Sequence, residues 1–210
     1  MTVETSSEPR VLLSTDWSGY KKILHALGDS PRVRVTYDRG RLEIMTTGHE
    51  HESLKTLIGR LLEVYMDETQ MTFQGGGAET FNRKKLDKGF EPDECYWIAN
   101  HPSMLGVKKW DPRCHPPPDV AVEVEISHGL IRRLPIYAAI GVPEVWWYHD
   151  DGIEILLLQP GARYQTSPSS PNFPCLAPRT LLQFVRLAPT MPTSDILRNF
   201  RRDVRQKLAG

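Results

Sequence analysis

The sequence has few cysteines, no excess of either charge and no long hydrophobic run, and each shortage excludes a class of protein. Its three cysteines are widely spaced and form no CxxC pair, which disfavours a structural zinc site and predicts a reduced, cytoplasmic location. Lysine plus arginine and aspartate plus glutamate each number 26, so a strongly basic nucleic-acid coat is excluded. The longest apolar run, Ile153–Leu158, contains Glu154 and is far shorter than the roughly 18 residues that span a bilayer. We therefore expect no membrane-spanning segment.

The composition is that of a globular protein. Of the 210 residues, 40% are hydrophobic and 25% are charged, so there is enough apolar mass to bury a core. The length suits one domain. We predict a loose leader over residues 1–14, a domain over residues 15–190 and a basic C-terminal helix within residues 191–210.

Hydrophobic periodicity predicts an alternation of helices and strands. Apolar residues at helical spacing predict helices at 17–28, 49–67, 130–140 and 195–208. Alternating and β-branched runs predict strands at 32–38, 41–45, 71–74, 79–81, 93–98, 119–126, 144–148 and 153–158, with one more from Tyr164. This order predicts a mixed α/β fold in which helices flank one central mixed β-sheet.

The segment 119–126 is the clearest buried strand. Side chains alternate along a strand, so one face is aliphatic and the other carries Asp119, Glu123 and Glu125. Burying carboxylates is costly unless a partner balances their charge, and a divalent cation such as Mg²⁺ is a simple partner. A solvent-exposed acidic face explains the same pattern equally well.

A further acid, Asp93, follows Pro92 at the start of a predicted strand. The proline holds the chain extended and fixes where the acid points, although Pro-Asp alone more often marks a turn. Asp93 and Glu123 together suit metal-assisted hydrolysis of a phosphodiester bond. Arg132 and Arg133 follow the acidic strand and are the nearest cations to stabilise the phosphate charge, although such residues more often form a solvated helix start.

Several motifs resemble one family of nucleases. They are GFEPDECY at 89–96, PPDVAVEVEI at 117–126 and IYAAIGVPEVW at 136–146, together with YDRGRLEIM at 37–45 and HEHE at 49–52. In combination, over residues 15–185, they resemble the Uma2 family of restriction endonucleases, within the PD-(D/E)XK nuclease superfamily. The resemblance implies a restriction-endonuclease-like core, Mg²⁺ or Mn²⁺ as cofactor and DNA as partner. A homodimer is a further expectation, because many nucleases that cut both strands pair two subunits.

The resemblance also implies a catalytic set of four residues, which are Asp93, Glu123, Glu125 and Arg133. Asp93 corresponds to the proline-linked acid and Glu123 to the acid of the second motif, and both are expected to bind the metal. The superfamily lysine is expected two residues after Glu123, where this chain has Glu125, and the basic residue is displaced to the next helix, as Arg133. Arginine is effectively always charged, so Arg133 suits orienting water and stabilising phosphate charge but is a poor general base.

The superfamily often adds a helix glutamate as a further metal ligand. On the predicted helix 49–67, Glu50 and His51 lie on or beside the apolar stripe and Glu52 points away, so Glu50 is the predicted ligand. First-turn acids that complement the helix dipole are an equally common explanation of Glu50. For His51, a hydrogen-bonded core histidine is the favoured interpretation.

Two functions follow from these patterns. The first is a metal-dependent endonuclease that hydrolyses DNA phosphodiester bonds. The second is a non-catalytic nucleic-acid-binding or protein-interaction module that retains the nuclease fold, and the missing lysine favours it.

Overall fold

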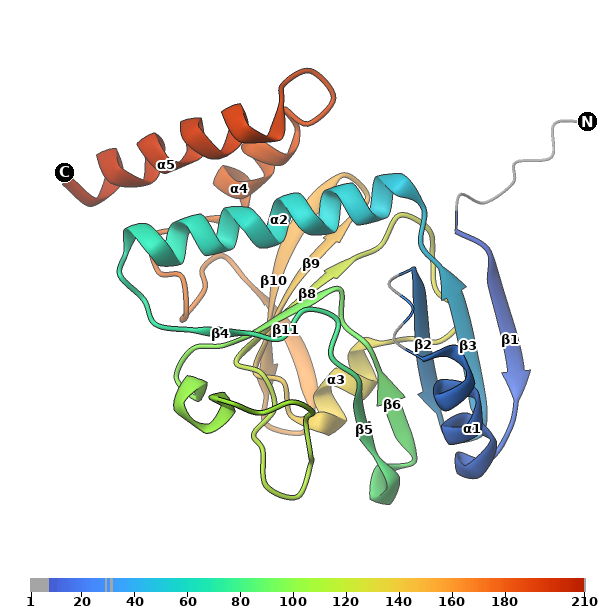
Figure 1. The fold of residues 1–210 in the computed structure, drawn as a ribbon. Helices are drawn as coiled ribbons and strands as arrows, with labels where there is room; N and C mark the ends of the chain where they lie inside the picture. Colours follow the sequence, from blue (N-terminus) through green and yellow to red (C-terminus); the bar gives the residue numbers. More distant parts are fainter. Residues whose placement is uncertain (1–7, 29, 31, 210) are drawn as a thin grey trace, which may run out of the picture.

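The computed structural model describes residues 8–28, 30 and 32–209, whose strands form two β-sheets rather than the single central sheet expected (Figure 1). The large sheet has the strand order β11-β10-β9-β8-β7-β4, and the small sheet has the order β1-β3-β2-β6-β5. The strands of the large sheet are β4 (Gln74–Gly75), β7 (Glu94–Trp97), β8 (Val120–Val124), β9 (Glu144–His149), β10 (Gly152–Gln159) and β11 (Arg163–Ser167). Those of the small sheet are β1 (Arg10–Ser14), β2 (Val33–Asp38), β3 (Arg41–Thr46), β5 (Phe81–Arg83) and β6 (Lys88–Phe90).

Strand β8 is central in the large sheet. It pairs antiparallel with β7, where Glu94 lies opposite Val122, and parallel with β9, where Glu123 lies opposite Trp147. The remaining strand pairs are antiparallel. The acid-bearing strand is therefore held on both edges, which fixes the positions of its side chains.

The two sheets are joined by a short segment around Pro92. Phe90 ends β6 in the small sheet, and Glu94 begins β7 in the large sheet. Proline has no amide hydrogen to donate to a strand ladder, so pairing is interrupted at this point. Asp93 thus lies at the seam between the two sheets.

The N-terminal segment differs from the sequence prediction. Residues 10–14, expected in a loose leader, form β1, which pairs with β3 from Arg10 opposite Met45 to Ser14 opposite Arg41. The reason is long-range pairing, which the short segment itself does not reveal. Residues 1–7 of the expected leader lie outside the described residues.

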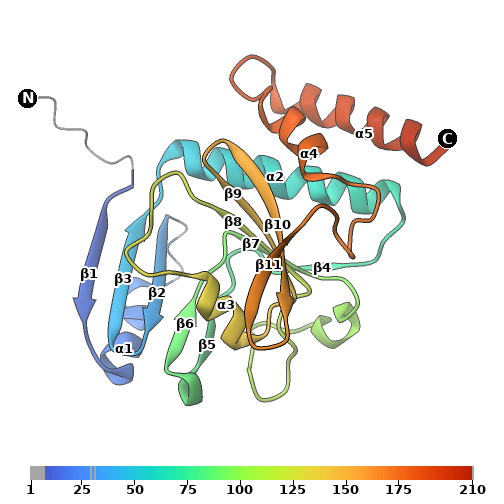
Figure 2. The ribbon, with the colours of Figure 1, turned by 180° about the vertical axis from the view of Figure 1, so that it is seen from behind.

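The helices lie on both sides of the large sheet and against the small one (Figures 1 and 2). They are α1 (Trp17–Leu27), α2 (His49–Glu68), α3 (Leu134–Ile140), α4 (Pro178–Val185) and α5 (Thr193–Ala209), with short 3-10 turns η1 (Lys84–Leu86) and η2 (His101–Met104). Helix α2 crosses one face of the large sheet with α4 and α5 beside it, and α3 lies against the other face. In the described part of the chain, no helix is long and apolar enough to cross a membrane.

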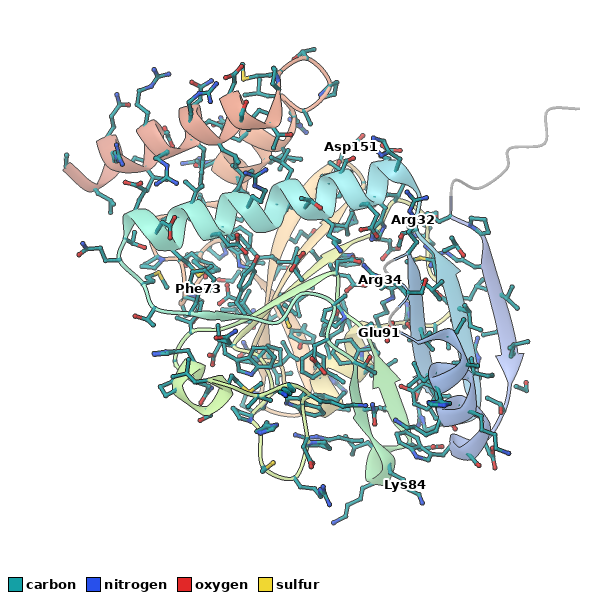
Figure 3. The ribbon with its side chains drawn as sticks, in the orientation of Figure 1. Arg32, Arg34, Phe73, Lys84, Glu91 and Asp151 are labelled. Carbon is teal, nitrogen blue, oxygen red and sulfur yellow. The ribbon has the colours of Figure 1, made fainter. Side chains whose placement is uncertain are left out.

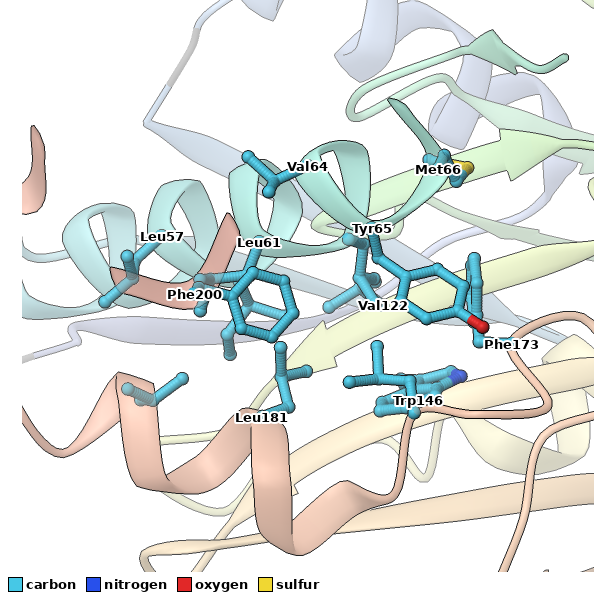
Figure 4. Close-up of a cluster of buried hydrophobic side chains, with 14 of the residues drawn as sticks. Leu57, Leu61, Val64, Tyr65, Met66, Val122, Trp146, Phe173, Leu181 and Phe200 are labelled. Atoms are coloured by element: carbon cyan, nitrogen blue, oxygen red, sulfur yellow. The ribbon is translucent and has the colours of Figure 1, made fainter. Parts of the chain in front are cut away.

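The main core lies between α2 and the large sheet (Figure 4). Leu61 and Tyr65 of α2 share a cluster with Val122 of β8, Leu181 of α4 and Phe200 of α5, all buried. Burying a large apolar side chain contributes about 1.5–3 kcal/mol relative to leaving it exposed. Helix α4 was not predicted, and it adds an apolar wall between α5 and the sheet.

A second cluster covers the other face of the large sheet. It holds Ala121 of β8 with Phe90 of β6 and Ile136 of α3. Because Val122 and Ala121 enter different clusters, the predicted alternation of β8 is confirmed. Helix α3 begins at Leu134 rather than 130, with Pro135 in its first turn, where the missing amide hydrogen costs nothing.

Candidate active site

Asp93 is fixed at the seam by the backbone of β8. Its N–H donates to the carbonyl of Val122 at 3.2 Å, and its Oδ2 accepts from the N–H of Val124 at 2.8 Å. The side chain is fully buried. The acid is therefore held on the large sheet, and it is aligned with the strand that carries Glu123.

Two cations balance the charge of Asp93. His51 Nε2 lies 2.8 Å from Oδ1, and Arg34 Nε lies 3.4 Å from the same oxygen. Burial alone would raise the pKa of Asp93, but the hydrogen bond and charge of His51, with the charges of Arg133 and Arg34, lower this pKa to about 2. The acid is therefore ionised at neutral pH although no water reaches it.

His51 joins Asp93 to a second buried carboxylate. Its Nδ1 lies 2.6 Å from Oε1 of Glu8, and its side chain is 1% exposed. Burial lowers the pKa of His51, but its hydrogen bonds to Asp93 and Glu8 outweigh burial and raise the pKa to about 9. A ring that faces a carboxylate at each nitrogen donates from both, so His51 is an imidazolium.

Glu123 points from β8 toward α3 and is also buried. Its Oε1 forms an ion pair with the guanidinium of Arg133, which lies at the start of α3. Its Oε2 accepts a hydrogen bond from the hydroxyl of Tyr137, one turn further along α3. Burial raises the pKa of Tyr137 far above its ordinary value, so this hydroxyl stays protonated and remains a donor. Glu123 and Arg133 thus form one cluster with Tyr137, and Asp93 forms a second with His51 and Arg34. The two clusters adjoin at β8, where Asp93 accepts from the N–H of Val124, the residue after Glu123. We call the two clusters together the carboxylate network.

The two remaining predicted acids make no hydrogen bond or ion pair with Asp93 or Glu123 among the described residues. Glu125 follows β8, and its Oε1 bonds the exposed His128 at 2.7 Å rather than a member of the network. Glu50 is exposed on the first turn of α2 and, within the described part of the chain, shares no hydrogen bond or ion pair with Asp93 or Glu123. The neighbouring His51 makes the contact from this helix. The interpretation of His51 as a hydrogen-bonded core histidine is confirmed, and its partner is the candidate catalytic acid.

Outer contacts tie this network to the small sheet. Glu8 accepts from Ser127 Oγ at 2.7 Å and from Arg10 at 2.9 Å. Arg10 also donates to Glu43 at 3.0 Å, and Glu43 accepts from the N–H of Ile131 at 2.8 Å. The loop between β8 and α3 is therefore held against β1 and β3 (Figure 2).

A cavity of about 590 Å³ opens beside this network, within the range of small-molecule sites. Its lining includes Glu123, Glu125, Arg10, Arg133 and Trp147. The cavity gives solvent and ligands access to Glu123 and its arginine, whereas Asp93 lies behind them.

The acid pair fits Mg²⁺ or Mn²⁺ in its chemistry. Hard cations prefer carboxylate oxygens, and Mg²⁺ is usually held by one or two carboxylates with waters and substrate phosphates. Among the described residues, no three His, Cys, Asp or Glu side chains are grouped as a metal site. All four oxygens of Asp93 and Glu123 accept from protein donors. Each carboxylate oxygen has a second lone pair, so a cation held here would share these oxygens with Arg133, Tyr137 or His51 or displace one of them.

Sequence reasoning missed Arg34, Tyr137 and Glu8. Arg34 sits in the alternating pattern of β2 and reads as an outward residue, yet its side chain is 3% exposed. Tyr137 lies inside a motif that the resemblance includes, and its spacing of four from Arg133 was a usable signal. Glu8 lies in the expected leader, where nothing in the sequence indicates burial.

Comparisons with known proteins identify the family and the fold of the chain. The family model Uma2, described as "Putative restriction endonuclease", matches residues 17–189. A crystal structure of "a putative nuclease belonging to DUF820 from Anabaena variabilis" aligns with a TM-score of 0.55 and 13% identity, over 77% of this chain and 96% of that chain. At this identity the likeness shows a shared fold. No curated protein matches the chain. Since the family model covers most of the sequence, the chain belongs to the Uma2 family.

Proposed function

We propose that this protein is a metal-dependent endonuclease that hydrolyses DNA phosphodiester bonds at Asp93 and Glu123. The observation that carries the proposal is a pair of buried carboxylates at the seam between two sheets, each balanced by an arginine. Burying an ion lowers the stability of the folded protein unless a partner compensates. Ionisable groups with strongly shifted pKa values gather at functional sites. Membership of a family described as restriction endonucleases supports a nuclease.

Asp93 and Glu123 would hold the Mg²⁺ or Mn²⁺ ion, which when bound supplies Lewis-acid stabilisation of the phosphate charge. Arg133 lines the cavity and offers a permanent positive charge to the phosphate. Tyr137 is a fixed hydrogen-bond donor beside Glu123. Glu125, on the same cavity wall, assists by drawing cations toward the site. His51 and Arg34 orient Asp93 and keep it ionised.

A plasmid assay tests this proposal. Supercoiled plasmid incubated with purified protein should be nicked or linearised with Mg²⁺ or Mn²⁺ and should stay intact with EDTA, because the cation supplies the electrostatic stabilisation. The variant Asp93→Asn, which keeps the shape but removes the charge, should lose this cleavage. The control Asp119→Asn alters another buried carboxylate on the same sheet and should keep it.

Two outcomes would end the proposal. One is an intact plasmid under all metal conditions with folded protein. The other is equal cleavage by wild type and Asp93→Asn, which would assign the activity to a contaminant.

A non-catalytic nucleic-acid-binding or protein-interaction module is the second candidate. The observation that favours it is that each of the four carboxylate oxygens already accepts from one protein donor, namely Arg133, Tyr137, His51 or the N–H of Val124. Isothermal titration with Mn²⁺ separates the candidates. Stoichiometric binding that Glu123→Gln removes supports the enzyme, and absence of binding supports the module.

Two sequence expectations complete the proposal. The protein is expected to form a homodimer, which sedimentation equilibrium would detect as twice the 24.0 kDa chain mass. It is expected to act in the cytoplasm, and fractionation of the source cells would test this.

A further inference from the structure

A second cavity, of about 500 Å³, lies between α1, β2, α2 and the segment before β5. We call it the basic pocket. Its cationic lining consists of Lys21 of α1, Arg34 of β2, Lys55 of α2 and Lys109 of the loop before β8. Elements from four parts of the chain thus bring positive charge to one place.

Two of the four cations of the basic pocket have no matching negative charge. Lys21 and Lys109 form no ion pair in the part of the chain that the structure describes, whereas Lys55 pairs with Glu52 at 3.2 Å and Arg34 pairs with Glu52 and with Asp93 at 3.4 Å. Burial, followed by the like charge of Lys109, lowers the pKa of Lys21. Two lysines that repel one another in this way are stabilised by an anion between them.

Among the described residues that line the basic pocket, Glu91 is the one carboxylate. Its oxygens already accept from Thr80 Oγ1 at 2.7 Å and from the N–H of Val35 at 3.1 Å. One carboxylate does not balance four cations, so the described lining is net positive.

One wall of the basic pocket is apolar. Leu24 and Leu27 of α1 and Val35 of β2 contribute to it. A ligand that satisfies both walls carries an anionic group and a flat apolar group. A volume of about 500 Å³ accommodates one such unit of the size of a nucleotide.

The basic pocket reaches the candidate catalytic acid through Arg34. This arginine lines the pocket and lies 3.4 Å from Asp93. Glu91, which stands two residues before Asp93 in the chain, is labelled next to Arg34 in Figure 3. The positive charge of Arg133 favours the ionised form of both Glu91 and Asp93. A ligand in the basic pocket is therefore adjacent to the carboxylate network.

We propose that the basic pocket binds one nucleotide of the substrate strand, with its phosphate between Lys21 and Lys109 and its base against Leu24 and Leu27. This inference rests on the proposed function, because it assigns the flanking nucleotide of a strand whose scissile phosphate lies at Asp93 and Glu123. Phosphate contacts of this kind position a strand without reading its sequence.

Isothermal titration with deoxyadenosine monophosphate in EDTA tests the pocket without catalysis. The nucleotide should bind more tightly than inorganic phosphate or deoxyadenosine alone. The double variant Lys21→Gln/Lys109→Gln should weaken its binding about tenfold or more, since two charged contacts are lost. The matched control Lys22→Gln/Lys108→Gln changes two exposed neighbours outside the pocket and should bind as the wild type does.

The inference is overturned if the nucleotide does not bind, or if both double variants bind it alike. A short single-stranded oligonucleotide added first should block the mononucleotide. If the mononucleotide still binds undiminished, the assignment to the substrate strand is wrong and the pocket takes free nucleotides. If the nucleotide binds but the plasmid stays intact, the proposed nuclease function is wrong and the basic pocket remains a nucleotide site. If Lys21→Gln/Lys109→Gln leaves plasmid cleavage unchanged, the assignment of the basic pocket to the substrate strand is wrong and the nuclease function stands.

Discussion

The large sheet buries carboxylates in two contrasting settings. Asp119, beside β8, accepts from the N–H groups of Ile98 at 2.7 Å and Asn100 at 3.0 Å and from the Asn100 amide at 2.7 Å. Glu144, at the start of β9, accepts from three side chains: Trp146 Nε1 at 2.6 Å, Ser170 Oγ at 2.5 Å and Asn172 Nδ2 at 2.8 Å. All these donors are neutral.

Asp93 and Glu123 are balanced by cations instead. Their partners include His51, Arg34 and Arg133. A carboxylate with fixed neutral donors pins a loop, and its partners cannot leave without exposing the charge. A carboxylate balanced by a charged side chain can exchange that partner for a metal cation, and an arginine released in this way can pair with an anion. The first setting builds structure, and the second suits chemistry.

The largest expected difference between the settings is in activity. Glu123→Gln should reduce plasmid cleavage about 1000-fold, because it removes a charge that the cation requires. Glu144→Gln, equally buried, should keep cleavage within a few-fold of wild type when the folded fraction is matched by circular dichroism. Equal losses in the two variants would remove the distinction.

The next effect is on stability. His51→Ala should lower the free energy of unfolding by about 3–5 kcal/mol, because Asp93 and Glu8 lose the cation between them. Urea denaturation in EDTA measures this change. His128→Ala removes an exposed partner of Glu125 and should change little. A small effect at His51 would show that the network is not a stabilising ion cluster.

The same residue should give the protein a pH-dependent stability. The pKa of His51 is raised from 6.5 to about 9, so its contribution is fully present below about pH 6.5 and is lost as pH rises through about 9. The change amounts to up to about 3 kcal/mol. Urea midpoints of wild type and His51→Gln should therefore converge over this window. Parallel curves would contradict a raised pKa.

The smallest effect is expected at the neutral setting. Ser170→Ala removes one of the donors to Glu144 and should cost about 1–2 kcal/mol of stability without changing cleavage. Ser169→Ala, at the exposed neighbouring position, is the control and should leave thermal unfolding unchanged. A loss of cleavage in Ser170→Ala would contradict the assignment of Glu144 to a purely structural role.

The sequence drew attention to the two buried acids but not to their partners. Pro92 before Asp93 and the alternation around Glu123 are local signals, and the structure buries both acids beside one another at β8. Which first-turn residue of α2 faces Asp93 depends on the docking angle of that helix, and one step along the chain separates Glu50 from His51. Local periodicity does not carry that information.

In the fold, too, local elements were predicted better than contacts between distant parts of the chain. Most helices and strands were predicted from periodicity, including the long helix α2 and the strand β8. The split into two sheets was not, because it depends on β2 pairing with β6 rather than with a strand of the large sheet. Such pairing is decided between residues about 50 positions apart, beyond the reach of local patterns.

The seam between the sheets has a mechanical consequence. Asp93 and Glu123 are both anchored to the backbone of the large sheet, whereas Arg34 belongs to the small sheet and His51 to α2. The large sheet alone therefore sets the spacing of the two acids, whereas the counter-charge that Arg34 supplies depends on how the small sheet packs against it.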